Sequence, residues 1–266
     1  MTPSNSPVEI LKLLDKSNCG ECGEKTCLAF AGAVFRGRKG LGDCPRLDPD
    51  VVERFTGEDP HTNELEDHRL EALEIMKRRV AQIDLHAAAQ RIGGWFSDGK
   101  LTVKMLGKDF SVDVDGNLYA EIHINPWVAA PFLDYVIHGK GVVPTGNWVS
   151  FRELKGGRTQ YPLFVKRCEE PMKRVADDST DLFDDMVHVF DGKQVQRQFQ
   201  SDVSVVLRFL PRVPAMVCYW SPEDGMGSSL NVFFDESADQ NLSIGSIFSL
   251  GAGFAQMLQK AALRHM

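Results

Sequence analysis

A chain of 266 residues is long enough for one or two domains, and its 43% hydrophobic and 25% charged residues are ordinary for a globular protein. Its net charge of −7 argues against general nucleic-acid binding, which needs a surplus of Lys and Arg to meet the phosphates. We see no apolar run long enough to cross a bilayer and no signal-peptide pattern, so we expect a cytoplasmic protein without membrane insertion.

A short predicted helix at residues 8–14 precedes the most informative stretch of the chain. Four cysteines lie within the first 44 residues, in the pattern C-x2-C-x4-C-x16-C-P. They are Cys19, Cys22, Cys27 and Cys44. Such clustering in a long chain does not suit a disulfide framework, which belongs to small secreted domains, and it indicates the ligand set of a metal centre.

The spacing of these cysteines favours an iron–sulfur cluster. The C-x2-C turn supplies two thiolates from one loop, and Gly20 and Gly23 let the backbone pass close to a cluster. A predicted helix from Thr26 to Arg36 would turn its positive dipole end toward this anionic centre. Structural zinc and unliganded thiols remain as alternatives, although zinc sites usually carry a Cys-x-x-Cys pair on both sides and only one is present here. A segment of about 45 residues has too little core to fold alone, so we expect the metal to fold it.

The same stretch resembles a known type of domain. The matching residues are Cys19, Gly20, Cys22, Gly23, Cys27, Phe30, Ala31, Cys44 and Pro45. Together they resemble the small iron–sulfur domain of the corrinoid iron–sulfur protein large subunit and of the B subunit of the Rnf electron-transport complex. The resemblance covers residues 8–46 and implies a low-potential [4Fe–4S] cluster that passes single electrons. The basic residues beside it are either a solvated loop or a docking edge for an acidic redox partner: Arg36, Arg38, Lys39 and Arg46.

A polar linker with two prolines follows the last cysteine. One long helix is then predicted from Asn63 to Arg91, with apolar residues along one stripe and Gly93-Gly94 at its end. We therefore divide the chain into three parts. They are a cluster domain at 1–47, a linker with the long helix at 48–92, and a larger domain at 93–266.

In the larger domain, runs with a period of two alternate with helical patterns. Strands are predicted at 101–106, 110–114, 118–124, 149–154, 182–190, 203–210, 215–220 and 230–234. Helices are predicted at 127–138, 162–176 and 244–263. These elements indicate an α+β fold with an antiparallel or mixed sheet and helices packed on it.

Four stretches of the larger domain resemble a second family, an uncharacterised domain of anaerobic bacteria and archaea that is often fused to this kind of cluster domain. They are 146–154, 161–167, 210–214 and 233–238. This resemblance spans residues 80–260 and identifies one domain without assigning it a chemistry.

The first resemblance makes a corrinoid (cobalamin) the natural candidate for a second cofactor. Such a ring needs an apolar pocket and in some proteins an axial His, for which His123, His138 and His188 are candidates. Trp148 is one of four tryptophans that could line a ring pocket, although buried tryptophans are more often core residues. The run Asp84-Leu85-His86 nearly matches a cobalamin-binding pattern, but Ala89 replaces its glycine and we expect the run to lie inside a helix.

The sequence therefore predicts an electron-transfer protein of anaerobes whose larger domain binds a corrinoid or serves a corrinoid enzyme. Its expected partner is a redox protein or a corrinoid protein. An accessory protein that docks the cluster on a partner enzyme, with no cofactor in the larger domain, remains the alternative. Asp235 and Glu236 form no convincing catalytic pair, so the sequence does not decide whether the protein is an enzyme.

Overall fold

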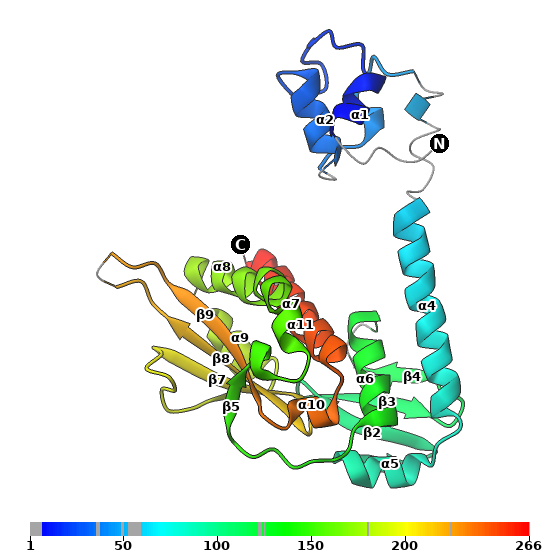
Figure 1. The fold of residues 1–266 in the computed structure, drawn as a ribbon, viewed down its shortest axis with the longest axis vertical. Helices are drawn as coiled ribbons and strands as arrows, with labels where there is room; N and C mark the ends of the chain where they lie inside the picture. The colour runs from blue at the N-terminus through cyan, green and yellow to red at the C-terminus, as the bar shows by residue number, and fades with distance from the viewer. Residues whose placement is uncertain are drawn as a thin grey trace. The chain divides into compact units, whose positions relative to one another are not determined.

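The structure is a computed structural model in which the described residues are 7–35, 38–48, 51–52, 60–121, 124, 126–179, 181–223 and 225–265. Its contacts divide the chain into two compact units, Met1–Glu71 and Ala72–Met266. Figure 1 shows the elements of each unit. We describe the two units separately.

The first unit is built on two short helices that match the predicted ones. Helix α1 (Pro7–Leu13) packs on α2 (Cys27–Phe35), and a single 3-10 turn, η1 (Leu41–Asp43), precedes the last cysteine. The Thr26 hydroxyl accepts a hydrogen bond of 3.0 Å from the Ala29 N–H and so caps the start of α2. The core of the unit is small. Its buried members are Ile10, Leu14, Cys27, Phe30, Ala31, Leu41 and Leu47.

The prediction of one long helix from Asn63 to Arg91 is wrong. The chain forms α4 (Pro60–Val80) and a separate α5 (Leu85–Ile92). The break occurs because the Asp84 carboxylate accepts the Ala87 N–H at 3.0 Å and begins a new helix. Gly93, in the left-handed region at φ 80°, ends that helix. The sequence predicted that the run Asp84-Leu85-His86 lies inside a helix. It lies instead at the start of one, with Asp84 as the cap.

A four-stranded antiparallel sheet follows α5, in the order β1-β2-β3-β4. Its strands are β1 (Trp95–Ser97), β2 (Lys100–Met105), β3 (Lys108–Asp113) and β4 (Leu118–Ala120). The predicted hairpin is confirmed, with Val103 opposite Phe110. Leu106 and Gly107, at φ 49° and 78°, make the two-residue turn that such a hairpin favours. The fourth strand ends before the predicted residue 124.

The second sheet has the order β5-β9-β8-β7-β6, and each neighbouring pair is antiparallel. Its strands are β5 (Trp148–Ser150), β6 (Lys193–Gln194), β7 (Val203–Leu210), β8 (Val213–Trp220) and β9 (Ser229–Asp235). The predicted central strands are confirmed, because β8 is almost wholly buried between β7 and β9. The predicted strand 149–154 is only partly correct, because the chain turns into η2 (Phe151–Glu153) after Ser150.

The remaining helices pack on the second sheet or on one another. They are α6 (Pro126–His138), α7 (Gly157–Phe164), η3 (Val165–Glu169), α8 (Glu170–Asp178), α9 (Asp181–His188), α10 (Ala238–Asn241) and α11 (Ile244–His265). The predicted helix 162–176 contains a π-helical turn, η3, between α7 and α8. The predicted strand 182–190 is wrong, since Leu182, Phe183 and Met186 are buried at helical spacing in α9.

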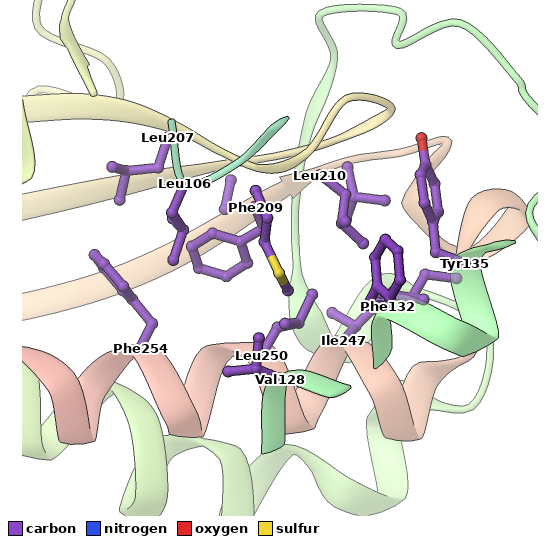
Figure 2. Packing of buried hydrophobic residues seen from close by; sticks show 14 of the residues in the cluster. Leu106, Val128, Phe132, Tyr135, Leu207, Phe209, Leu210, Ile247, Leu250 and Phe254 are labelled. Atoms are coloured by element: carbon purple, nitrogen blue, oxygen red, sulfur yellow. The ribbon is translucent and has the colours of Figure 1, made fainter. Parts of the chain in front are cut away.

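Helix α11 provides much of the core of the larger unit. Figure 2 shows Phe254 of α11 facing Phe209 of β7, with Leu250 and Ile247 along the same helix face. The Phe209 and Phe254 ring centroids lie 5.4 Å apart, and both side chains are buried. In the part of the chain that the structure describes, no helix is long and apolar enough to span a membrane. The α+β class predicted from the sequence is confirmed.

Replacing Phe254 with Ala should lower the free energy of unfolding by about 3–5 kcal/mol, because the surrounding side chains cannot close a cavity of this size. Phe199→Ala is the matched control, since Phe199 is 50% exposed. The loss of unfolding free energy in Phe199→Ala should be clearly smaller than in Phe254→Ala. Urea denaturation followed by circular dichroism measures both, and equal losses would contradict this packing.

Candidate metal centre and a cleft in the larger unit

The loop between α1 and α2 carries the first two cysteines and turns tightly. Asn18, Gly20 and Gly23 all have positive φ angles, at 53°, 75° and 80°. The Gly23 N–H donates to the Gly20 carbonyl at 2.9 Å and closes the turn between Cys19 and Cys22. A Cβ is unfavourable at positive φ, and this is the physical reason for glycine at both positions.

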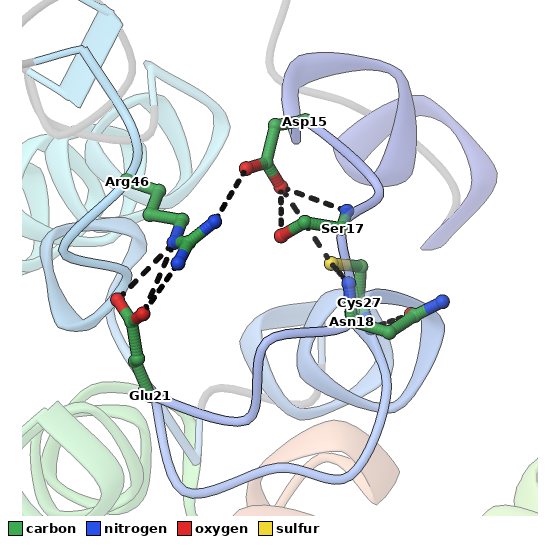
Figure 3. Close-up of polar contacts among 6 residues, drawn as sticks. All are labelled: Asp15, Ser17, Asn18, Glu21, Cys27 and Arg46. Atoms are coloured by element: carbon green, nitrogen blue, oxygen red, sulfur yellow. Dashed lines mark hydrogen bonds and ion pairs between the residues drawn. The ribbon is translucent and has the colours of Figure 1, made fainter.

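Cys27 stands at the first turn of α2, where it is tied to Asn18 (Figure 3). The Asn18 side-chain oxygen accepts the Cys27 N–H at 2.8 Å, and the Asn18 N–H donates to the Cys27 sulfur at 3.4 Å. An N–H group directed at a cysteine sulfur is the kind of hydrogen bond that tunes a cluster ligand. The Asp15 carboxylate lies 4.0 Å from the same sulfur.

An ion pair links the two ends of the cysteine region (Figure 3). Arg46, two residues after the last cysteine, lies 2.6 Å from the Glu21 carboxylate in the C-x2-C turn and 3.9 Å from Asp15. Hydrogen bonding from Arg46 lowers the pKa of Glu21, and hydrogen bonds from Ser17 lower the pKa of Asp15. Lys39 also donates to the carbonyl of Cys22. Two members of the predicted basic group thus hold the loop, while Arg36 lies outside the described residues.

The donor set has the chemistry that an iron–sulfur cluster requires. All six cysteines are free thiols. Cys27 is buried, Cys22 and Cys44 are partly buried against the same small core, and Cys19 is exposed. Among the described residues, however, no three His, Cys, Asp or Glu side chains lie close enough together to hold one metal ion. The ligand assignment therefore rests on the residue types and their surroundings.

The larger unit contains a cleft of about 730 Å³ between its two sheets. The first sheet contributes Trp95, Lys104 and Gly107. The second sheet contributes Trp148, Val206, Arg208, Pro211, Arg212, Pro214 and Asp235, and the loop before β5 contributes residues 144–146. This volume is typical of a site for a small organic ligand.

Asp235 fixes one wall of the cleft. Its buried carboxylate accepts the N–H groups of Thr145 at 3.1 Å and Gly146 at 2.7 Å, and also the Ser237 hydroxyl at 2.6 Å. Burial alone would raise the pKa of Asp235, but these hydrogen bonds outweigh it and lower the pKa. Asp235 is therefore an ionised brace for the loop.

The predicted cofactor residues fall in different places. Trp148 lines the cleft, as the ring-pocket hypothesis requires. His138 and His188 do not: His138 Nδ1 lies 2.8 Å from Asp134, and His188 Nδ1 lies 2.9 Å from the Asp184 carbonyl, within its own helix. His123 lies outside the described residues. Sequence reasoning gave no binding role to the cleft arginines Arg208 and Arg212, although Arg212 lies in the stretch 210–214 that resembles the second family.

Comparison with known families defines the two parts of the chain. Residues 14–46 match the FeS family, whose model describes an Fe-S cluster, so the first unit contains an iron–sulfur domain. Residues 84–257 match the model of the domain of unknown function DUF3786. This match covers well over half of the chain, and the chain belongs to the DUF3786 family.

Curated relatives match over short stretches only. The gamma 1 subunit of the acetyl-CoA decarbonylase/synthase complex of Methanosarcina thermophila is 51% identical over 43 residues, which are 16% of this chain and 9% of the relative. The corrinoid/iron-sulfur protein large subunit of Moorella thermoacetica is 55% identical over 38 residues, 14% of this chain and 8% of the relative. The chain thus spans less than a tenth of the length of these two relatives. No solved structure matches.

The six thiols should differ in reactivity. Burial raises the pKa of the Cys168 and Cys218 thiols, so neither should react with iodoacetamide until the protein unfolds. In metal-free protein the four N-terminal cysteines should be alkylated well before Cys168 and Cys218, and a bound cluster should protect all four. Mass spectrometry after a short pulse of reagent measures this order. Labelling of Cys168 as fast as Cys19 would contradict the structure.

Asp235→Asn should lower the free energy of unfolding by about 1–3 kcal/mol, because the amide leaves one of the buried N–H groups of the loop without an acceptor. The difference in unfolding free energy between the wild type and this variant should have its full size above about pH 4, the ordinary pKa of an Asp side chain. It should shrink as the pH falls through the lowered folded-state pKa, where the wild-type carboxylate takes up a proton.

Urea denaturation at several pH values measures this dependence. Glu236→Gln is the control, since Glu236 is the exposed neighbour and also contacts this loop, through Thr145 and Asn147. A cost at Asp235 that stays constant down to pH 2 would contradict the ionised brace.

Proposed function

We propose that the first unit holds a low-potential [4Fe–4S] cluster on Cys19, Cys22, Cys27 and Cys44 and passes single electrons. The observation that carries this proposal is the match of residues 14–46 to an iron–sulfur family, in a region with four reduced thiols. The Asn18 N–H on the Cys27 sulfur and the positive-φ glycines of the C-x2-C turn support it. When bound, the cluster supplies a one-electron redox couple. The chain supplies the thiolates, N–H donors to sulfur and a partly apolar setting.

The larger unit, in this proposal, serves a corrinoid-dependent partner in a reducing cytoplasm. The identity of the matched relatives supports the partner class, since they are a subunit of the acetyl-CoA decarbonylase/synthase complex and the large subunit of a corrinoid/iron-sulfur protein. Electrons would pass from the cluster to the partner's cofactor, and the DUF3786 domain would place the cluster beside it. This role needs no cofactor in the larger unit. It combines electron transfer by the cluster with the docking role of an accessory protein.

A second candidate function is direct corrinoid binding by the larger unit, and one observation favours it. His138 is half exposed, and its Nδ1 lies 2.8 Å from the Asp134 carboxylate. A carboxylate on one ring nitrogen orients the other nitrogen as a metal ligand. Burial alone would raise the pKa of Asp134, but hydrogen bonds from Ser243, Ser246 and His138 lower it, so the carboxylate stays ionised beside the ring. His138 is therefore the best-supported candidate for an axial ligand.

Anaerobic purification followed by a visible spectrum and metal analysis tests both proposals. We expect a broad absorption band in the blue part of the visible spectrum, with about four iron atoms and about four acid-labile sulfides per chain. Cys44→Ala should lose most of this iron, whereas Cys218→Ala, far from the first unit in sequence, should keep it. A colourless protein with one zinc atom and no sulfide would overturn the cluster assignment.

The cobalt content separates the two roles of the larger unit. One cobalt per chain, with sharp corrinoid bands that change in His138→Ala, would favour direct binding. Iron without cobalt would favour a partner-serving protein, and the partner should then be retained on immobilised wild-type protein. Loading with iron and sulfide in the presence of added cobalamin, monitored by the same spectrum, shows whether an empty site takes up the cofactor.

A further inference from the structure

The cleft of the larger unit contains two arginines that are not matched by an ion pair among the described residues. Lys104 is paired with Asp109 at 2.7 Å, and the Asp235 carboxylate is occupied by the loop before β5. Arg208 and Arg212 form no ion pair with any residue for which the structure gives a position. Asp191 and Asp235 are the acidic lining residues, so the cleft carries anionic as well as cationic groups, and what marks it out is these two arginines without an ion pair in the described part of the chain.

Arg212 is held in place and is only partly satisfied. Its backbone N–H donates to the Tyr135 hydroxyl at 3.0 Å, and its carbonyl accepts from the Asn241 amide at 3.1 Å. Its Nε is buried and has no hydrogen-bond partner among the residues described. A guanidinium that is partly desolvated and unpaired is costly unless an anion compensates it. An anion in the cleft would provide that compensation on a side chain whose backbone is already fixed.

The same cleft offers flat apolar surfaces. Trp95 is 43% exposed and Trp148 is partly exposed, although both are large rings that a folded protein normally covers. Pro144, Pro211 and Pro214 line the cleft beside them. Exposed indole faces next to arginines suit a ligand that has a flat ring and a charged group.

We propose that this cleft binds a phosphorylated compound with a flat ring, the chemistry of a mononucleotide. Arg208 and Arg212 would hold the phosphate, since guanidinium groups match its geometry and two of them balance a dianion. Trp95 and Trp148 would contact the ring. The N–H groups of Thr145 and Gly146 are already bonded to Asp235, so the arginines are the cationic donors for the ligand. This site is independent of the cluster.

Titration calorimetry on the full-length protein tests the proposal with matched pairs of probes. Adenosine monophosphate is compared with adenosine, and flavin mononucleotide with riboflavin, so that each pair differs only in the phosphate. We expect each phosphorylated probe to bind at least about tenfold more tightly than its partner, the effect of charge-assisted hydrogen bonds. Binding should weaken as salt increases. Equal affinities within each pair, or no binding of any probe at millimolar concentration, would overturn the proposal.

Two arginine variants and one control locate the site. Arg208→Met and Arg212→Met should each weaken the phosphorylated probes about tenfold or more and leave the unphosphorylated probes unchanged. Arg197→Met is the control, because Arg197 is an exposed arginine that does not line the cleft. If Arg212→Met fails to fold, the affinity of Arg208→Met alone tests the site. The Arg208 side chain is exposed, so its replacement should not prevent folding. Wild-type affinity in a folded Arg208→Met would overturn the site. Cys44→Ala should bind the probes normally, which separates this result from the fate of the cluster.

Discussion

The larger unit depends on how its two sheets are joined. The Leu106 N–H at the β2–β3 turn donates to the Arg208 carbonyl of β7 at 3.0 Å, so the turn of one sheet is hydrogen-bonded to a strand of the other. Gly107 makes this approach feasible, because a Cβ there would lie 2.4 Å from the Cβ of Asp191. Side chains of both sheets, α6 and α11 form one continuous core, and the cleft is lined by residues of strands, turns and loops of the two sheets. Core and cleft therefore both depend on this junction.

The first unit has a different physical basis. Its buried apolar set is small for a segment of this length, and Cys27 is a member of that set. Thiolate–metal bonds in such a segment are folding energy as well as redox chemistry. The Arg46–Glu21 pair and the Asn18 contacts then organise the loop around the ligands without adding much core.

Elements with local signals could be predicted from the sequence, and those that depend on distant neighbours could not. The helix that begins at Cys27 and the hairpin around Gly107 have capping and turn residues within a few positions. The strand predicted for 182–190 failed because its apolar residues fit both periods, and burial against β7 selects the helix. The cysteines were found because ligands of one metal lie close in sequence. The cleft arginines and the tryptophans Trp95 and Trp148 come from separate stretches of the chain and line one cleft only after folding, so the sequence did not indicate that they belong together.

The π-helical turn Val165–Glu169 joins α7 to α8 in one continuous helical rod and determines which residues of α8 face the core. It places the buried Glu169 carboxylate 2.9 Å from the Val232 N–H, which ties this rod to the main chain of β9. A π-turn takes up one extra residue, so the helices on either side keep the faces that they would have in a regular helix without that residue. Met172 and Val175 of α8 therefore face the core. Deleting one residue from within α8 would instead rotate the rest of that helix by about 100° and bring its charged residues into the core. A change of one residue in length is therefore better tolerated at this turn than inside the regular helices beside it.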